Sequence, residues 1–199
     1  MVIPTLTTVQ KIVGPLQGQW TYADWEQLSN DDKRYEIIDG VLYCSDVPSI
    51  FHQSIVGQLI QYLALPAKLD GFGLHNVGVI LSNRSVLIPD FALVKAENAA
   101  IMVDKRIRGM PDLIAEVLSP GNKDYDEDVK LIAYAKSGVS EYVVIDAWKK
   151  QLRLYSQPTA GEYGALKKSN ADDSVTFACV PGLSLVVGDL FAGSPDETM

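Results

Sequence analysis

Two acidic residues stand alone in stretches that are otherwise apolar. Residues 86–94 are apolar on both alternating faces apart from Asp90, and residues 113–118 carry their single charge at Glu116. A strand that is apolar on both faces is buried on both faces. A buried carboxylate needs a proton, a cationic partner or a metal ion. Asp90 and Glu116 are therefore the first candidates for chemistry.

The chemistry depends on whether these two carboxylates meet. If the two segments are neighbouring strands, Asp90 and Glu116 lie about 5 Å apart across the sheet. Carboxylates about 4 Å apart repel each other by about 4 kcal/mol at an effective dielectric constant of roughly 20. The pair then needs a proton, a cationic side chain or a divalent cation between its members. Oxygen ligands without a nearby His or Cys cluster favour Mg²⁺, with Mn²⁺ as the alternative.

A lysine follows in an apolar helical segment. Lys130 has apolar neighbours on both sides, so its helix buries much of its circumference. The amine then either reaches solvent or points at an acid. A structural interpretation stays open, in which Asp90 is a strand-end acid held by loop N–H groups and Glu116 forms an ion pair with Lys130. Pro89 predicts a sheet edge or a bulge directly before Asp90, because proline removes a ladder donor.

The surrounding elements must bring these residues together. Hydrophobic periodicity and turn signals predict a short helix, a hairpin, two longer helices and five strands. Their expected ranges are 21–28 for the short helix, 34–43 for the hairpin with its turn at Asp39-Gly40, 49–65 and 124–137 for the longer helices, and 74–81, 86–94, 112–118, 141–146 and 151–155 for the strands. Residues 95–110 are expected to form a charged loop. The order helix, strand, strand, strand, helix, strand over residues 49–146 indicates a mixed α/β core.

Composition narrows the classes of function. The 199 residues predict one domain, and the net charge of −8 argues against a protein that coats nucleic acid, since phosphate binding relies on Lys and Arg. A local basic surface stays open within residues 84–108. Two cysteines are too few for a disulfide framework or a cysteine-based zinc site. With neither a long apolar run nor a secretory pattern, we expect no membrane contact and a reducing, cytoplasmic location.

Several motifs, taken in order, resemble the Uma2 family of restriction-endonuclease-like proteins. They are Tyr35–Leu42, His52–Leu59, Pro89-Asp90, Pro111–Pro120, Lys130 with Tyr134, Gly138–Tyr142, Ile145-Asp146 and Pro181–Leu185. The resemblance covers roughly residues 20–192 and implies the PD-(D/E)XK nuclease fold. That fold is an α/β (α+β) architecture: a restriction endonuclease-like αβββαβ core with a mixed central sheet, here with an N-terminal hairpin and C-terminal strands. We expect one domain over residues 21–192, an irregular segment over 1–20 and a tail over 193–199.

The resemblance also implies a site. Asp90 is the acid of the PD motif and Glu116 is the second acid, and together they would hold Mg²⁺ or Mn²⁺, with help from the Val117 carbonyl. The position two residues after the second acid, usually a lysine, is Leu118, and Lys130 of the following helix is the matching lysine. The implied reaction is metal-assisted hydrolysis of phosphodiester bonds in DNA.

Two further residues are supporting catalytic candidates. Glu36 lies in the hairpin motif and His52 begins the first helix of the core. Each has a plain alternative, because Glu36 can be a surface acid of the hairpin and His52 can be a partly exposed histidine at a helix start.

Other functions stay open beside the nuclease. A catalytically inactive nuclease-fold module that binds a protein or nucleic-acid partner would suit the acidic charge, which opposes DNA except at the cleft. A glycosidase with a carboxylate pair lacks an aromatic platform for sugar. The nuclease is favoured because a buried acid pair is costly to retain without a use. A homodimer is expected, since one site cuts one strand and nucleases of this fold often pair.

Overall fold

The computed structural model describes residues 12–28, 31, 33–65, 70–119 and 123–195. In chain order the elements are α1 (Tyr22–Trp25), β1 (Lys33–Ile38), β2 (Val41–Asp46), α2 (Ile50–Leu59), η1 (Ile60–Ala64), β3 (Gly71–Leu74), β4 (Val79–Ser82), β5 (Ser85–Leu87), β6 (Phe91–Lys95), η2 (Ala96–Ile101), β7 (Met102–Val103) and β8 (Arg106–Arg108). They continue as β9 (Leu113–Val117), η3 (Tyr125–Lys130), α4 (Leu131–Ser137), β10 (Glu141–Asp146), β11 (Gln151–Thr159), β12 (Glu162–Asn170), β13 (Ser174–Phe177), β14 (Val180–Val186) and η4 (Val187–Phe191). Of these, η1 and η3 are π-helical turns that continue into or from an α-helix.

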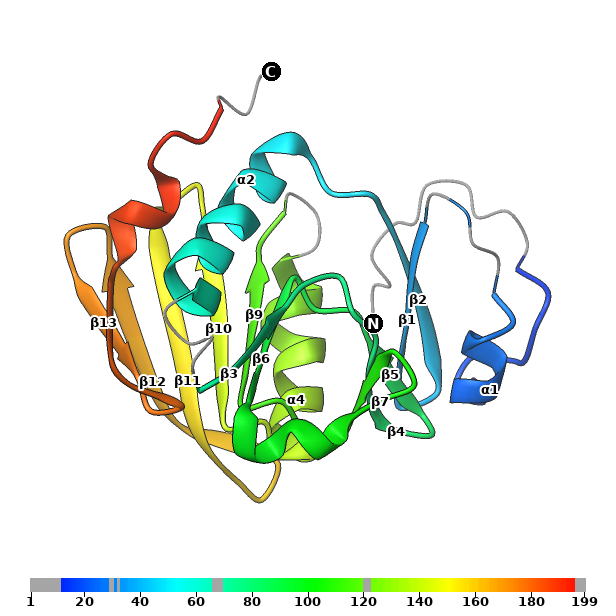
Figure 1. The fold of residues 1–199 in the computed structure, drawn as a ribbon. Coiled ribbons are helices and arrows are strands. Elements are labelled where there is room, and N and C mark those ends of the chain that lie inside the picture. The colour runs from blue at the N-terminus through cyan, green and yellow to red at the C-terminus, as the bar shows by residue number, and fades with distance from the viewer. Residues whose placement is uncertain (1–11, 29–30, 32, 66–69, 120–122, 196–199) are drawn as a thin grey trace.

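The central sheet has the strand order β12-β11-β10-β9-β6-β3 (Figure 1). Strands β9 and β10 are parallel, and the other neighbours are antiparallel, so the sheet is mixed. Helix α2 packs on one face, where Ile55 and Leu59 meet Ala115 and Val117 of β9. Helix α4 packs on the opposite face. The order α2, β3, β6, β9, α4, β10 is the expected αβββαβ core, and the predicted fold class is confirmed.

Local signals position the ends of these elements as expected. The Ser49 hydroxyl accepts the backbone N–H of His52 and caps the start of α2. Gly138 ends α4 in the left-handed conformation, at φ 83°. Asp39 and Gly40 both have positive φ and close the β1–β2 hairpin as a two-residue turn. The predicted hairpin and both longer helices are therefore confirmed, although the Pro66 stop lies outside the described residues.

The predictions of single strands over 74–81 and 86–94 are wrong. A second sheet, with the order β2-β1-β5-β4-β8-β7, stands beside the core, and the chain passes between the two sheets twice in these segments (Figure 1). The second passage is at Pro89, between β5 and β6, because a residue without an N–H cannot continue a ladder. Asp90 therefore lies just before β6, at the point where the two sheets meet.

The prediction of a charged loop over residues 95–110 is also wrong. The segment contains η2 and the short strands β7 and β8. Ile107 of β8 is fully buried against Val79 of the second sheet and Ala92 of the core. The segment was predicted to be a loop because it contains many charged residues, and its one fully buried residue did not change that composition.

The two terminal segments are described only in part. The expected irregular segment 1–20 and tail 193–199 lie partly outside the described residues, at 1–11 and 196–199. In the described part of the chain, no helix has the length and apolar character needed to cross a membrane.

Candidate active site

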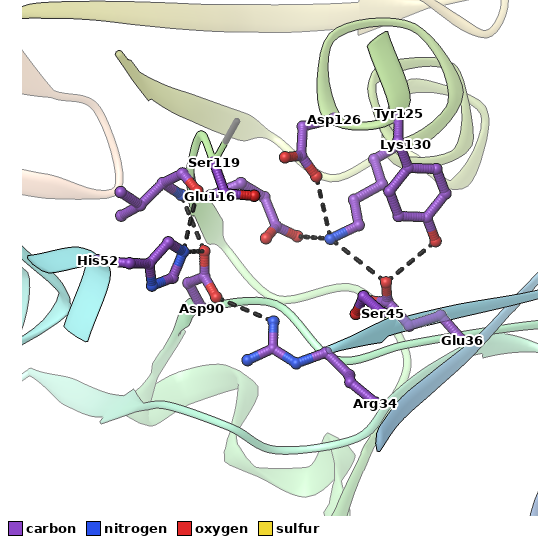
Figure 2. A pocket seen from close by; sticks show the side chains of 11 residues that line it. Arg34, Glu36, Ser45, His52, Asp90, Glu116, Ser119, Tyr125, Asp126 and Lys130 are labelled. Carbon is purple, nitrogen blue, oxygen red and sulfur yellow. Dashed lines mark hydrogen bonds and ion pairs between the residues drawn. The ribbon is translucent and has the colours of Figure 1, made fainter. Parts of the chain in front are cut away.

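A small polar pocket opens where the two sheets meet the start of α2 and the helical segment η3 (Figure 2). Its lining is almost entirely polar and comes from six separate parts of the chain. The lining residues are Arg34, Glu36, Ser45, His52, Asp90, Glu116, Val117, Ser119, Tyr125, Asp126 and Lys130. All five residues predicted for the site are among them. The sequence pattern selected these residues, but only the folded chain shows that they lie together.

Asp90 is brought to the second acid by strand pairing. Strands β6 and β9 are antiparallel with Phe91 opposite Ala115, so Asp90 and Glu116 follow at the same edge. Asp90 is buried, and its Oδ2 atom accepts the backbone N–H of Val117 at 2.9 Å. Its Oδ1 atom accepts Nη1 of Arg34 at 3.0 Å. Each carboxylate oxygen thus has a donor, which satisfies a charge far from bulk water.

His52 holds the same carboxylate from the side of α2. Its Nε2 atom lies 3.0 Å from Asp90 Oδ2 and 3.0 Å from the carbonyl oxygen of Val117. Both partners are acceptors, so Nε2 carries the proton. The ring is buried, and its Nδ1 atom has no hydrogen-bond partner among the described residues. The alternative of a partly exposed histidine is wrong.

Lys130 is the centre of a second cluster of charges. Its Nζ atom lies 2.9 Å from Glu116, 3.2 Å from Asp126 and 3.5 Å from Glu36, and the ring of Tyr125 lies beneath it at 5.1 Å. Asp126 is placed one helical turn before Lys130 in η3. All four charged side chains are buried. The predicted pairing of Glu116 with Lys130 therefore exists, inside a larger network.

Two tyrosines and one backbone group complete that network. The Tyr134 hydroxyl donates to Glu116 Oε1 at 2.9 Å, and the Tyr125 hydroxyl donates to Glu36 Oε2 at 3.0 Å. The other oxygen of Glu36 accepts the N–H of Ile88 at 2.7 Å. Glu36 is buried and joins the hairpin to the core, so the alternative of a surface acid is wrong.

The electrostatics of the pocket favour an added cation. Four carboxylates and two cationic side chains line it, which leaves two negative charges when all six are ionised and the imidazole is neutral. Burial raises the pKa of Glu116 well above its ordinary value despite the opposing effect of Lys130. Burial also opposes ionisation of Asp90, but His52, Arg34 and Lys130 outweigh it and hold the pKa of Asp90 below its usual range. The pocket therefore contains one firmly ionised acid, Asp90, and one, Glu116, that holds a proton more easily than usual.

Asp90 lies among oxygen atoms of the kind that can hold a divalent cation. Oδ2 of Asp90 and the carbonyl oxygen of Val117 both face the N–H of His52, 3.0 Å from Nε2, so a cation bound by these two oxygens would have to replace that hydrogen bond. Oxygen ligands with excess negative charge suit Mg²⁺ or Mn²⁺. No group of three His, Cys, Asp or Glu side chains in the described part of the chain is already arranged around a common centre. Glu116, which is turned onto Lys130, is the side chain that must rotate to join such a site.

Asp126 makes the stability of the metal-free protein depend on pH. Burial, together with the charges of Asp90 and Glu36, raises its pKa from 3.8 to about 6 although Lys130 opposes this. The folded protein therefore keeps a proton that the unfolded chain has released, and the free energy of unfolding falls as pH rises from about 4 to about 6. We expect Asp126→Asn to reduce this fall by about 2 to 3 kcal/mol in urea titrations with EDTA. Identical pH profiles for the two proteins would contradict the prediction.

Five lining residues of the pocket were not predicted as site residues from the sequence: Arg34, Ser45, Ser119, Tyr125 and Asp126. Tyr134 was not predicted either; it does not line the pocket but contacts Glu116. Arg34 and Glu36 are two residues apart in β1, so their side chains lie on the same face of the strand. Asp126 precedes Lys130 by four residues, which is the spacing of neighbours on a helix. Both spacings could have indicated that Arg34 and Asp126 belong to the site. The tyrosines carried no such signal, because buried aromatic residues are ordinary components of a core.

A solved structure shows the class of fold that holds this pocket. The chain is similar to the crystal structure of a putative nuclease belonging to DUF820 from Anabaena variabilis, with a TM-score of 0.73. The match covers 86% of this chain and 97% of that chain at 17% sequence identity, so it shows a shared nuclease-like α+β fold. No curated protein matches the chain.

The sequence itself shows the family. The model of the Uma2 family, described as a putative restriction endonuclease, matches residues 21–188. Because this range is most of the 199 residues, the chain belongs to the Uma2 family. The predicted resemblance is confirmed, and family and fold together support an enzyme of the nuclease class.

Proposed function

We propose that this chain is a metal-dependent endonuclease that hydrolyses phosphodiester bonds in DNA. The observation that carries the proposal is the convergence of Asp90, Glu116 and Lys130 in one buried pocket with excess negative charge. These side chains come from three separate elements, and a purely structural ion pair would need only two of them. Mg²⁺ is the proposed cofactor, with Mn²⁺ as the alternative.

Asp90, Glu116 and the Val117 carbonyl would hold the metal. When bound, a divalent cation lowers the pKa of a water ligand and offsets charge that builds on the phosphate. Glu116, when ionised, would be the carboxylate placed to hold the metal together with Asp90 or to accept a proton beside it. The metal would join residues that hydrogen bonds hold in place, with Glu116 turning from Lys130 toward it.

Lys130 would act on the carboxylates and on the attacking water. Its ammonium lies against Glu116, Glu36 and Asp126. This positive charge offsets the repulsion between the three buried carboxylates and so allows the folded site to keep them close together. An ammonium beside Glu116 would also help to orient a water and to offset negative charge that develops on a phosphate. His52 is proposed as a positioning residue, because its N–H bridges Asp90 and the Val117 carbonyl.

The test is cleavage of supercoiled plasmid and of single-stranded DNA by the purified protein. We expect nicking with Mg²⁺ or Mn²⁺ and none with EDTA, since the acids then lack their cation. An unchanged melting temperature on adding either metal, with no cleavage of either substrate, would contradict the proposal and favour a binding module of the same fold. Size-exclusion chromatography with light scattering tests the proposed homodimer in the same preparation.

Tyr134→Phe should show how strongly Glu116 depends on its hydrogen bond. The hydroxyl donates to Glu116 Oε1 from a fully buried position, so its loss leaves that carboxylate less well oriented. We expect the nicking rate to fall by about 10-fold to 100-fold.

Tyr163→Phe is the matched control for this substitution. The Tyr163 hydroxyl donates to the Val139 carbonyl at 2.9 Å and lines no part of the pocket. Both variants lose one hydrogen bond, worth about 1 kcal/mol of stability. Equal nicking rates for the two variants would show that Tyr134 has no role in the site.

A further inference from the structure

The two cations of the pocket differ in what they are free to bind. Lys130 is deeply buried and lies within 3.5 Å of three carboxylates. Arg34 contacts one carboxylate, Asp90, through a single nitrogen at 3.0 Å. The exposed fractions of the two side chains are 16% for Arg34 and 4% for Lys130. Arg34 is therefore the more exposed cation of the pocket, and among the described residues it has one acidic partner.

The unused donors of Arg34 are accessible. A guanidinium group has five N–H donors in a planar fork. Within the described residues, only Nη1 has a protein acceptor, and neither Nε nor Nη2 is among the buried polar atoms without a partner. The Arg34 side chain lines the pocket and is 16% exposed, so part of it is open to the pocket. A planar fork with free parallel donors matches the oxygens of a phosphate group.

A hydroxyl lies beside this fork. Ser45 of β2 is directly opposite Arg34 of β1 in the hairpin register, so the two side chains share one face. Both line the pocket, and the Ser45 hydroxyl has no hydrogen-bond partner among the described residues (Figure 2). Arg34 and Ser45 together offer anion donors on the side of the pocket that the β1–β2 hairpin forms.

We propose that Arg34, assisted by Ser45, is the phosphate-binding group of the site and grips the DNA backbone next to the metal. The inference rests on the proposed function, and it assigns this task to the hairpin β1–β2, outside the αβββαβ core. It also divides the work of the cations, because Lys130 holds the acids together while Arg34 binds the substrate. In the absence of DNA the ion pair with Asp90 holds the guanidinium in place.

The test is fluorescence anisotropy of a short labelled DNA duplex at low ionic strength, with Ca²⁺ as the cation. We expect Arg34→Gln to weaken binding about tenfold, as for the loss of a charged hydrogen bond. The slope of log affinity against log salt concentration should decrease by about 0.9, which is the loss of one phosphate contact. Arg34→Lys should keep the charge and therefore the salt slope, but it should bind DNA several-fold more weakly because it lacks the planar fork of donors. Ser45→Ala should bind DNA about threefold more weakly.

Lys168→Gln is the matched control, because it removes one exposed positive charge on β12, at the far edge of the central sheet. Its affinity and salt slope should equal those of the wild-type protein. If Arg34 is only a counterion of Asp90, Arg34→Gln changes the melting temperature and the calorimetric Mn²⁺ affinity but neither the DNA affinity nor the slope, which overturns the inference. If Arg34→Gln does not fold, wild-type affinity in both Arg34→Lys and Ser45→Ala overturns it.

The outcome is separable from that of the proposed function. Binding that depends on Arg34, in a protein that no metal induces to cleave DNA, would support this inference and overturn the hydrolysis. Metal-dependent cleavage by the wild-type protein, together with unchanged DNA binding in Arg34→Gln, would support the proposed hydrolysis and overturn this inference.

Discussion

Asp90→Asn is expected to lower the rate of metal-dependent plasmid nicking by about three orders of magnitude. Asparagine keeps the shape of the side chain and one acceptor oxygen, but it removes the negative charge that would attract the cation. Loss of several kcal/mol of charge stabilisation corresponds to this factor, at about 1.4 kcal/mol for each tenfold change in rate. The rate is measured on supercoiled plasmid, and Mn²⁺ affinity is measured in parallel by calorimetry.

Asp146→Asn provides a matched control. Asp146 is also buried, at the end of β10 in the same sheet, and it also pairs with an arginine, since its Oδ2 atom lies 2.9 Å from Nη2 of Arg153. It lines no part of the pocket. We expect a similar loss of stability in both variants and a loss of Mn²⁺ affinity in Asp90→Asn alone. Full nicking activity in Asp90→Asn would remove Asp90 from the proposed metal site.

Lys130→Met is expected to lower the free energy of unfolding by about 3 to 5 kcal/mol, because it leaves buried carboxylates without their shared cation. The amine contacts Glu116, Asp126 and Glu36, and each is buried. Urea denaturation at neutral pH with EDTA measures the effect. The deficit should shrink as pH falls to about 5, because the carboxyl groups of Asp126 and Glu116 already have raised pKa values and take up protons.

Lys136→Met tests whether any lysine of this helix would behave in the same way. Lys136 is exposed on α4, and its amine lies 3.4 Å from Asp39 in an exposed ion pair. Such pairs contribute about 0 to 1 kcal/mol. Equal destabilisation by the two substitutions would show that the buried carboxylates do not depend on Lys130.

The central chemistry was predictable because it depends on burial. A lone charge in a strand that is apolar on both faces is anomalous wherever that strand lies, so Asp90 and Glu116 could be found from the pattern alone. Strands β6 and β9 are paired, which confirms the expectation that the segments carrying the two acids are neighbouring strands. The hairpin turn and the helix ends were also predictable, since Gly40 and Gly138 act on the backbone next to them.

The division of the chain between two sheets was not predictable from local pattern. Strands β5 and β6 are equally apolar, so hydrophobicity indicated one strand across Pro89 where the structure has two. Proline marked an interruption, but the identity of the sheet on each side depends on pairing with distant strands. The same reason explains the missed strand β8, whose one buried residue is Ile107.

Burial preference and turn chemistry belong to a residue and its immediate neighbours, and for this reason the chain alone revealed its paired acids, its helix ends and its family. The partners of those acids belong to the folded molecule. Arg34 reaches Asp90 across 56 residues of chain, and His52 reaches the Val117 carbonyl across 65. Contacts over such separations arise when two sheets and a helix pack together, because packing places a polar group of one element beside a charge of another. A local sequence pattern cannot predict these contacts, since it contains only one of the two partners.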